Sequence, residues 1–109
     1  MFDDDDDDFA DVGSLQQIPK GGVRFVEVDG RELMLYRSDE VVVAMGGNCT
    51  HAFASLRDGD VEGTTIVCKR HGARFDLKTG RSLSGTCPNL PRFEVQIAGA
   101  RVLVKRDRD

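Results

Sequence analysis

The sequence predicts an all-β protein with a single domain. Short runs in which apolar or β-branched residues alternate with polar ones are separated by glycines, and no apolar 3.6-residue period extends over a helical length. A chain of 109 residues can bury one small core. We therefore expect short strands joined by tight turns, and no second domain for chemistry on a substrate.

The expected strands follow one another at short spacing. Asp29-Gly30 separates two of them and is a type I′ hairpin signal, and residues 98–100 form a second tight connection. The longest apolar run, residues 41–45, has the length of a strand and is too short to span a membrane. The full set of expected strands is 10–12, 23–28, 32–37, 41–45, 65–68, 74–76, 93–97 and 102–105.

Six consecutive aspartates, Asp3 to Asp8, dominate the N-terminal segment. Without them 13 of the 19 acidic residues remain against 15 basic ones, so the formal charge of −4 becomes about +2 for the rest of the chain. Because like charges this dense cannot be buried together, we expect residues 1–8 to be a disordered acidic tail and residues 9–107 to form the domain. This beginning is unlike a secretory signal, and we expect a cytoplasmic protein.

Two cysteine–histidine pairs carry the chemistry of the chain. Cys49-Thr50-His51 is followed after sixteen residues by Cys68-Lys69-Arg70-His71, and these are the only two histidines. Common zinc sites pair cysteine with cysteine and histidine with histidine, whereas each pair here contains one of each. A two-iron cluster with cysteines on one iron and histidines on the other needs such mixed pairs.

The two pairs, together with Phe75-Asp76-Leu77-Lys78-Thr79-Gly80, resemble a Rieske ferredoxin of the kind that serves bacterial aromatic-ring-hydroxylating oxygenases. The resemblance covers about residues 9–105. It implies a Rieske-type antiparallel β-sandwich base with an inserted cluster-binding lobe at about residues 48–85. It also implies one [2Fe–2S] cluster per chain.

The resemblance assigns a role to each residue of the two pairs. Cys49 and Cys68 would bind the inner iron, and His51 and His71 the outer iron, with the imidazole edges at the tip where a partner docks. Cys87 is expected to be a packing residue or a free thiol and not a ligand. No general-base histidine is left for catalysis, so we expect an electron carrier and not an enzyme.

Two positions after the second pair indicate the reduction potential. High-potential Rieske proteins resemble this chain but have a serine and a tyrosine that donate to the cluster where this sequence has Ala73 and Phe75. They also have a disulfide between positions that are Ala54 and Arg70 here. Without these groups we expect a potential near the low end of the Rieske range, which is about −150 to +300 mV.

The sequence thus predicts a soluble one-electron carrier, a monomer that passes electrons from an NAD(P)H-dependent flavin reductase to a terminal Rieske non-haem iron oxygenase. Docking would be transient, at the tip formed by His51 and His71. Two alternatives stay open at this point: the small Rieske subunit of an assimilatory nitrite reductase, and a structural zinc-binding module. No basic stripe for nucleic acid is evident.

Overall fold

The computed structural model of the protein describes residues 8–39, 41–48, 55–69, 72–84 and 88–106. Strands predominate there and form three antiparallel sheets, with the orders β1-β10-β9, β2-β3-β4-β8 and β5-β6-β7. The elements are β1 (Phe9–Ser14), the 3₁₀ turn η1 (Leu15–Gln17), β2 (Val23–Val28), β3 (Arg31–Ser38), β4 (Val41–Gly46), the 3₁₀ turn η2 (Leu56–Asp58), β5 (Asp60–Glu62), β6 (Thr65–Val67), β7 (Arg74–Asp76), β8 (Arg92–Phe93), β9 (Val95–Ala98) and β10 (Arg101–Lys105).

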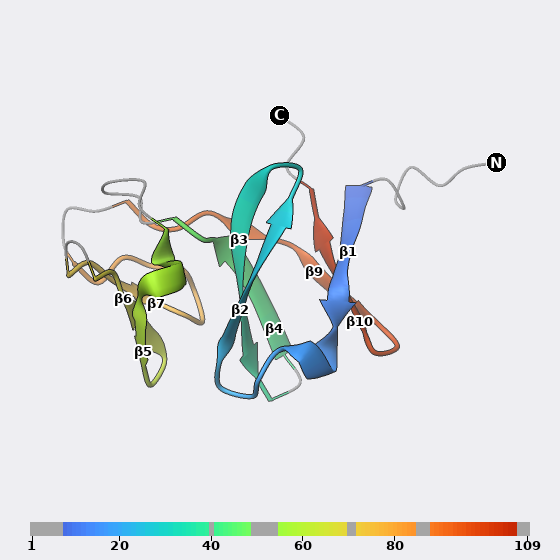
Figure 1. Ribbon diagram of the computed structural model, residues 1–109, viewed down its shortest axis with the longest axis horizontal. Helices are drawn as coiled ribbons and strands as arrows, with labels where there is room; N and C mark the ends of the chain where they lie inside the picture. The colour runs from blue at the N-terminus through green and yellow to red at the C-terminus, as the bar shows by residue number, and fades with distance from the viewer. Residues whose placement is uncertain (1–7, 40, 49–54, 70–71, 85–87, 107–109) are drawn as a thin grey trace.

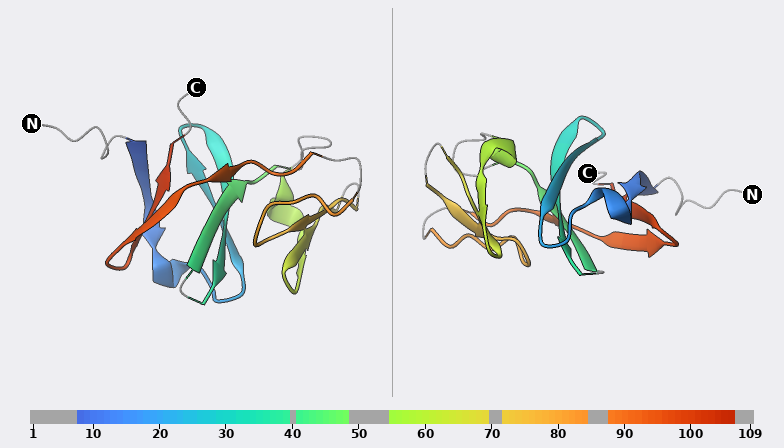
Figure 2. Two further views of the ribbon diagram at one scale, coloured as in Figure 1. Left: turned by 180° about the vertical axis from the view of Figure 1, so that it is seen from behind. Right: turned by 60° about the horizontal axis from the view of Figure 1, so that its bottom comes forward.

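The four-stranded sheet β2-β3-β4-β8 is the middle layer of the molecule (Figures 1 and 2). Successive side chains of a strand point to opposite faces of the sheet. On β3, Met34 belongs to one hydrophobic cluster and the adjacent Leu35 to another, and neither is exposed to solvent. Met45 and Ala44 on β4 divide in the same way. Burial of both faces explains why these strands are almost continuously apolar.

The sheet β1-β10-β9 covers one face of this middle layer and completes the base. Val102 and Val104 of β10 are fully buried in the same cluster as Leu33 and Leu35 of β3. We call this cluster the base core. β1 pairs with β10, although it lies at the opposite end of the chain, with Phe9 opposite Lys105. This pairing closes the base.

The small sheet β5-β6-β7 lies on the other side of the middle layer and forms a lobe (Figure 2). Ile66, Phe75 and Leu77 of the lobe are buried in one cluster with Met34 and Met45 of the middle sheet. We call this second cluster the lobe core. Because the lobe core is shared between the lobe and the middle sheet, the lobe is anchored to the base by apolar packing.

The structure confirms the all-β class and the sandwich base with an inserted lobe. The type I′ turn is confirmed as well, since Asp29 and Gly30 have φ angles of 53° and 80°. The expected strand at 93–97 was wrong in one respect. The chain changes sheets at Glu94, so that β8 pairs with β4 and β9 pairs with β10.

Strand β5 was not expected.

The described residues contain no helix that is long and apolar enough to cross a membrane.

Candidate metal centre

The first cysteine–histidine pair follows β4 in the chain, between Asn48 and Ser55. These two residues form an isolated antiparallel bridge. The amide of Leu56 donates to the carbonyl oxygen of Gly47 at 2.7 Å. We call residues 48–55 the first arm. Its two ends are therefore held together by backbone contacts, while Cys49, His51 and Ala54 lie outside the described residues.

The second pair lies in the connection between β6 and β7. The amide of Cys68 donates to the carbonyl oxygen of Ala73, and the amide of Gly72 donates to the carbonyl oxygen of Cys68, both at 2.8 Å. We call residues 68–73 the second arm. Cys68 is 2 % exposed and forms no disulfide. Arg70 and His71 lie outside the described residues.

The strand that follows the first arm lies beside the strand that precedes the second arm. β5, which follows the first arm, pairs with β6, which precedes the second arm, so that Asp60 lies opposite Val67. Val67 is the residue directly before Cys68. The lobe sheet therefore brings the end of the first arm and the start of the second arm onto neighbouring strands.

Two residues later in the chain, Ser84 and Pro91, contact the stems of the arms. The amide of Arg74, just after the second arm, donates to the hydroxyl oxygen of Ser84 at 2.7 Å. The amide of Gly46, just before the first arm, donates to the carbonyl oxygen of Pro91 at 2.9 Å. Ser84 thus contacts the stem of the second arm and Pro91 the stem of the first. Cys87 lies between Ser84 and Pro91 in the sequence but outside the described residues.

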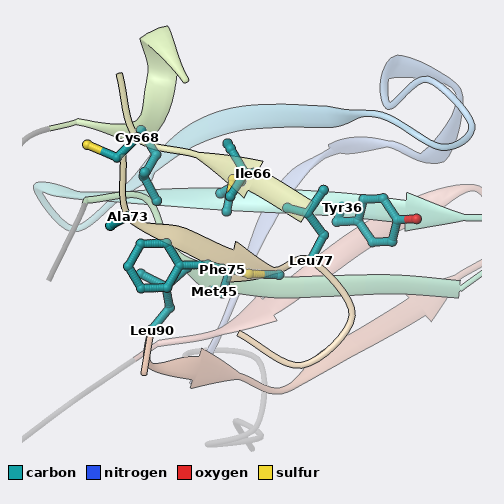
Figure 3. Close-up of a cluster of buried hydrophobic side chains, with 10 residues drawn as sticks. Tyr36, Met45, Ile66, Cys68, Ala73, Phe75, Leu77 and Leu90 are labelled. Carbon is teal, nitrogen blue, oxygen red and sulfur yellow. The ribbon is translucent and has the colours of Figure 1, made fainter. Parts of the chain in front are cut away.

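Cys68 lies at the edge of the lobe core, beside apolar side chains. Figure 3 shows Cys68, Ala73, Phe75 and Leu90 at one end of the lobe core, with Tyr36 at the other end. Ala73 and Phe75 are 2 % and 0 % exposed. The sulfur of Cys68 is thus sheltered from water, which suits a thiolate that binds the inner iron of a mixed cysteine–histidine cluster. The residues at 73 and 75 have no hydroxyl to donate to it.

Two arginines close to the arms are paired with carboxylates. Arg57 forms an ion pair with Glu32 at 2.7 Å, and Arg74 forms one with Glu62 at 3.2 Å. Glu32 lies on β3, far before both arms in the sequence. Sequence reasoning missed this carboxylate because only the pairing of β3 with β4 brings it to the first arm.

Gly72 gives a test of the second arm. Its φ is +70°, and a side chain there would meet open space, so alanine would bring only backbone strain of about 1–2 kcal/mol. We expect Gly72→Ala to lower stability by this amount and to shift the EPR spectrum of the reduced protein. Gly63→Ala is the matched control, because Gly63 has φ +65° and open space but lies in the β5–β6 turn. Equal spectra for the two variants would contradict a role of Gly72 in shaping the arm.

Of the four expected ligands, Cys68 is the one that the described residues contain, and the structure places it at the start of the second arm, directly after β6. In the described part of the chain, no group of three or more histidine, cysteine, aspartate or glutamate side chains is arranged to hold a metal ion. The full ligand set of Cys49, His51, Cys68 and His71 stays a prediction.

Comparison with known proteins places the chain in a family. Residues 8–94 match the family described as the Rieske [2Fe-2S] domain. The ferredoxin component of the naphthalene 1,2-dioxygenase system of Pseudomonas aeruginosa is 39% identical over 97 residues, which are 88% of this chain and 93% of that protein. The ferredoxin component of the naphthalene 1,2-dioxygenase/salicylate 5-hydroxylase systems of a Ralstonia species is 35% identical, over 91% of this chain and 96% of that protein.

Solved structures agree. The ferredoxin of carbazole 1,9a-dioxygenase from Nocardioides aromaticivorans IC177 superposes with a TM-score of 0.82 at 30% identity, covering 91% of this chain and 98% of that one. A chain from the complex of reduced oxygenase and oxidized ferredoxin in carbazole 1,9a-dioxygenase gives the same TM-score at 31% identity, covering 94% and 96%. The buried Cys68, the two adjacent arm stems and these matches lead to one conclusion: the chain belongs to the Rieske [2Fe-2S] domain family.

Proposed function

We propose that this protein carries single electrons from an NAD(P)H-dependent flavin reductase to a terminal Rieske non-haem iron oxygenase that acts on an aromatic ring. The observation that carries the proposal is the likeness, along 88% of the chain, to a protein named as the ferredoxin component of an aromatic dioxygenase system. The protein is thus an electron-transfer component and does not itself transform a substrate.

Each ligand has a part in the proposal. Cys49 and Cys68 hold the inner iron of the [2Fe–2S] cluster, and His51 and His71 hold the outer iron. When bound, the cluster accepts and releases one electron. Burial of Cys68 in the lobe core supports its place at the sheltered iron. The apolar surroundings limit access of water to the thiolate.

The end of the lobe at His51 and His71 is the proposed docking surface. A ferredoxin is found in complex with its oxygenase in the carbazole system, which supports an oxygenase as the acceptor here. A shuttle must dissociate after each transfer, so a small interface suits it. A monomer in the cytoplasm, with no nucleic-acid partner, completes the proposal.

The reduction potential is proposed to lie near the low end of the Rieske range, which is about −150 to +300 mV. Hydrogen bonds to the cluster sulfurs stabilise the reduced state, which carries more negative charge, and so raise the potential. Ala73 and Phe75, both buried beside Cys68, have no side-chain donor for this purpose. A low potential suits reduction by a flavin and not the oxidation of a quinol.

A redox titration followed by visible and EPR spectroscopy tests the proposal. We expect a rhombic signal of the reduced protein with a low average g value, and a potential near the low end of the range. The double variant Ala73→Ser/Phe75→Tyr should have a higher potential. Tyr36→Phe is the control, because it removes a hydroxyl from the far end of the same core (Figure 3) and should leave the potential unchanged.

Two outcomes of this experiment would redirect the interpretation. A colourless protein with stoichiometric zinc would overturn the electron carrier and restore the zinc-binding module. A protein with the Rieske spectrum that co-purifies in a stable complex with a siroheme enzyme would favour the nitrite reductase subunit. The named relatives reported above are ferredoxin components, which favours the carrier.

A further inference from the structure

Glu32 of β3 contacts the beginning of the first arm through its backbone. Its carbonyl oxygen accepts a hydrogen bond from the amide of Gly47 at 3.0 Å. The contact is close: a Cβ on Gly47 would lie 3.0 Å from Cγ of Glu32 and 3.2 Å from its carbonyl oxygen. The residue before Asn48 is therefore pressed against Glu32, and glycine is the residue that permits this approach.

The side chain of Glu32 contacts the other end of the same arm. Its Oε1 accepts a hydrogen bond from the hydroxyl of Ser55 at 2.7 Å, and its Oε2 accepts one from Nε of Arg57 at 2.8 Å. The Nη2 atom of Arg57 lies 2.7 Å from Oε2 as well. One residue of the base thus contacts the chain on both sides of the loop that contains Cys49 and His51.

Further contacts make this network rigid. The hydroxyl oxygen of Ser55 accepts from the amide of Arg57 at 3.0 Å, which caps the turn η2. The guanidinium of Arg57 lies over the ring of Phe25 on β2, 5.4 Å from its centroid. The planar guanidinium fork is therefore fixed from below by an aromatic ring and from the side by a carboxylate.

Glu32 remains charged at neutral pH. Partial burial alone would raise the pKa of its carboxyl, but the hydrogen bonds from Ser55 and Arg57 and the positive charge of Arg57 outweigh burial and lower this pKa below its ordinary value. The side chain is 21% exposed. This carboxylate is thus better shielded than Glu62, which pairs with Arg74 and is 56% exposed.

We infer that Glu32 is a positioning residue of the metal centre: it fixes the separation of the two ends of the first arm and thereby holds Cys49 and His51 in the geometry that the cluster requires. This inference rests on the proposed ligand set. Partners of ligand-bearing groups commonly change metal affinity by about 10–100-fold when they are removed. Glu32 would act less directly than such a partner, through Gly47 and Ser55 at the two ends of the arm.

Loss of the cluster from the purified holoprotein is the measurement that tests the role of Glu32. We expect Glu32→Gln and Glu32→Ala to release iron to a chelator about tenfold faster than the unmodified protein, and to broaden the EPR signal. Ser55→Ala should have a smaller effect in the same direction, because Arg57 remains bound to Glu32. The rates are compared with the unfolding transition of each variant, followed by far-UV circular dichroism.

Asp11→Asn is the matched control. Asp11 and Arg101 also form a two-pronged carboxylate–guanidinium pair, at 3.1 and 2.9 Å, but they join β1 to β10 in the base. We expect Asp11→Asn to leave the rate of iron release unchanged. Equal release rates for Glu32→Gln, Asp11→Asn and the unmodified protein would overturn the positioning role while the proposed function stands. An unmodified protein without a Rieske spectrum would overturn both.

Should Glu32→Ala fail to fold, Glu32→Gln and Ser55→Ala still decide the matter, since both keep the size of the side chain nearly unchanged. Release of iron that is faster only in proportion to the loss of global stability would also count against a positioning role. Faster release at unchanged global stability is the result that supports it.

Discussion

Replacing Cys68 with alanine should yield a colourless protein that binds no [2Fe–2S] cluster. Cys68 is buried at the start of the second arm, and a cluster that needs two thiolates on one iron cannot form with one of them. Iron and acid-labile sulfide analysis, with the visible spectrum, measures the loss. Because alanine differs from cysteine by one atom, far-UV circular dichroism should show the base strands intact.

Cys87→Ala is the control for this prediction. Cys87 is the third cysteine of the chain and is not part of the proposed ligand set. This variant should keep its full iron and sulfide content and its potential. A Cys68→Ala protein that retains the Rieske spectrum, or a Cys87→Ala protein that loses it, would show that the ligands have been assigned to the wrong cysteines.

Replacing Phe75 with alanine should cost about 3–5 kcal/mol of folding free energy and should also release the cluster. Phe75 is fully buried in the lobe core with Cys68 and Ala73, and it stands on β7 directly after the second arm. The cavity left by the ring would let the arm move. Chemical unfolding measures the stability, and the visible spectrum measures the retention of the cluster along the same titration.

Leu35→Ala separates the two effects. Leu35 is also fully buried, but it belongs to the base core on the opposite face of the middle sheet. Its loss should cost about 2–5 kcal/mol. We expect this variant to keep its cluster until the whole protein unfolds, whereas Phe75→Ala loses the cluster at lower denaturant. Identical behaviour of the two variants would mean that the lobe core does not control the site separately.

The strands that could be predicted from the sequence are those whose pattern reflects their burial. β2, β3 and β4 are rich in apolar residues because both faces of the middle sheet are covered, and their ranges were found to within a residue or two. β5 could not be predicted, since all three of its residues are exposed and only its pairing with β6 makes it a strand.

The site divides in the same way. The cysteine–histidine spacing indicates the kind of metal centre, because the types of the ligand residues determine which metal or cluster they can bind. The contact between Glu32 and the first arm has no such signal. Glu32 precedes Cys49 by a whole strand, and it reaches Ser55 only through the register in which Leu33 of β3 lies opposite Gly46 of β4. Long-range register is a property of the folded sheet and not of any local pattern.

The two-sided middle sheet has a consequence for protein engineering. Neighbouring residues of β3 pack into different cores. Leu33 and Leu35 face the base, whereas Met34 and Tyr36 face the lobe. A mutant library confined to every second residue of this strand would sample the redox centre while leaving the base untouched, and the complementary library would do the reverse. Thermal robustness and electron-transfer behaviour could therefore be optimised in separate campaigns and combined afterwards, because changes on opposite faces share few direct contacts.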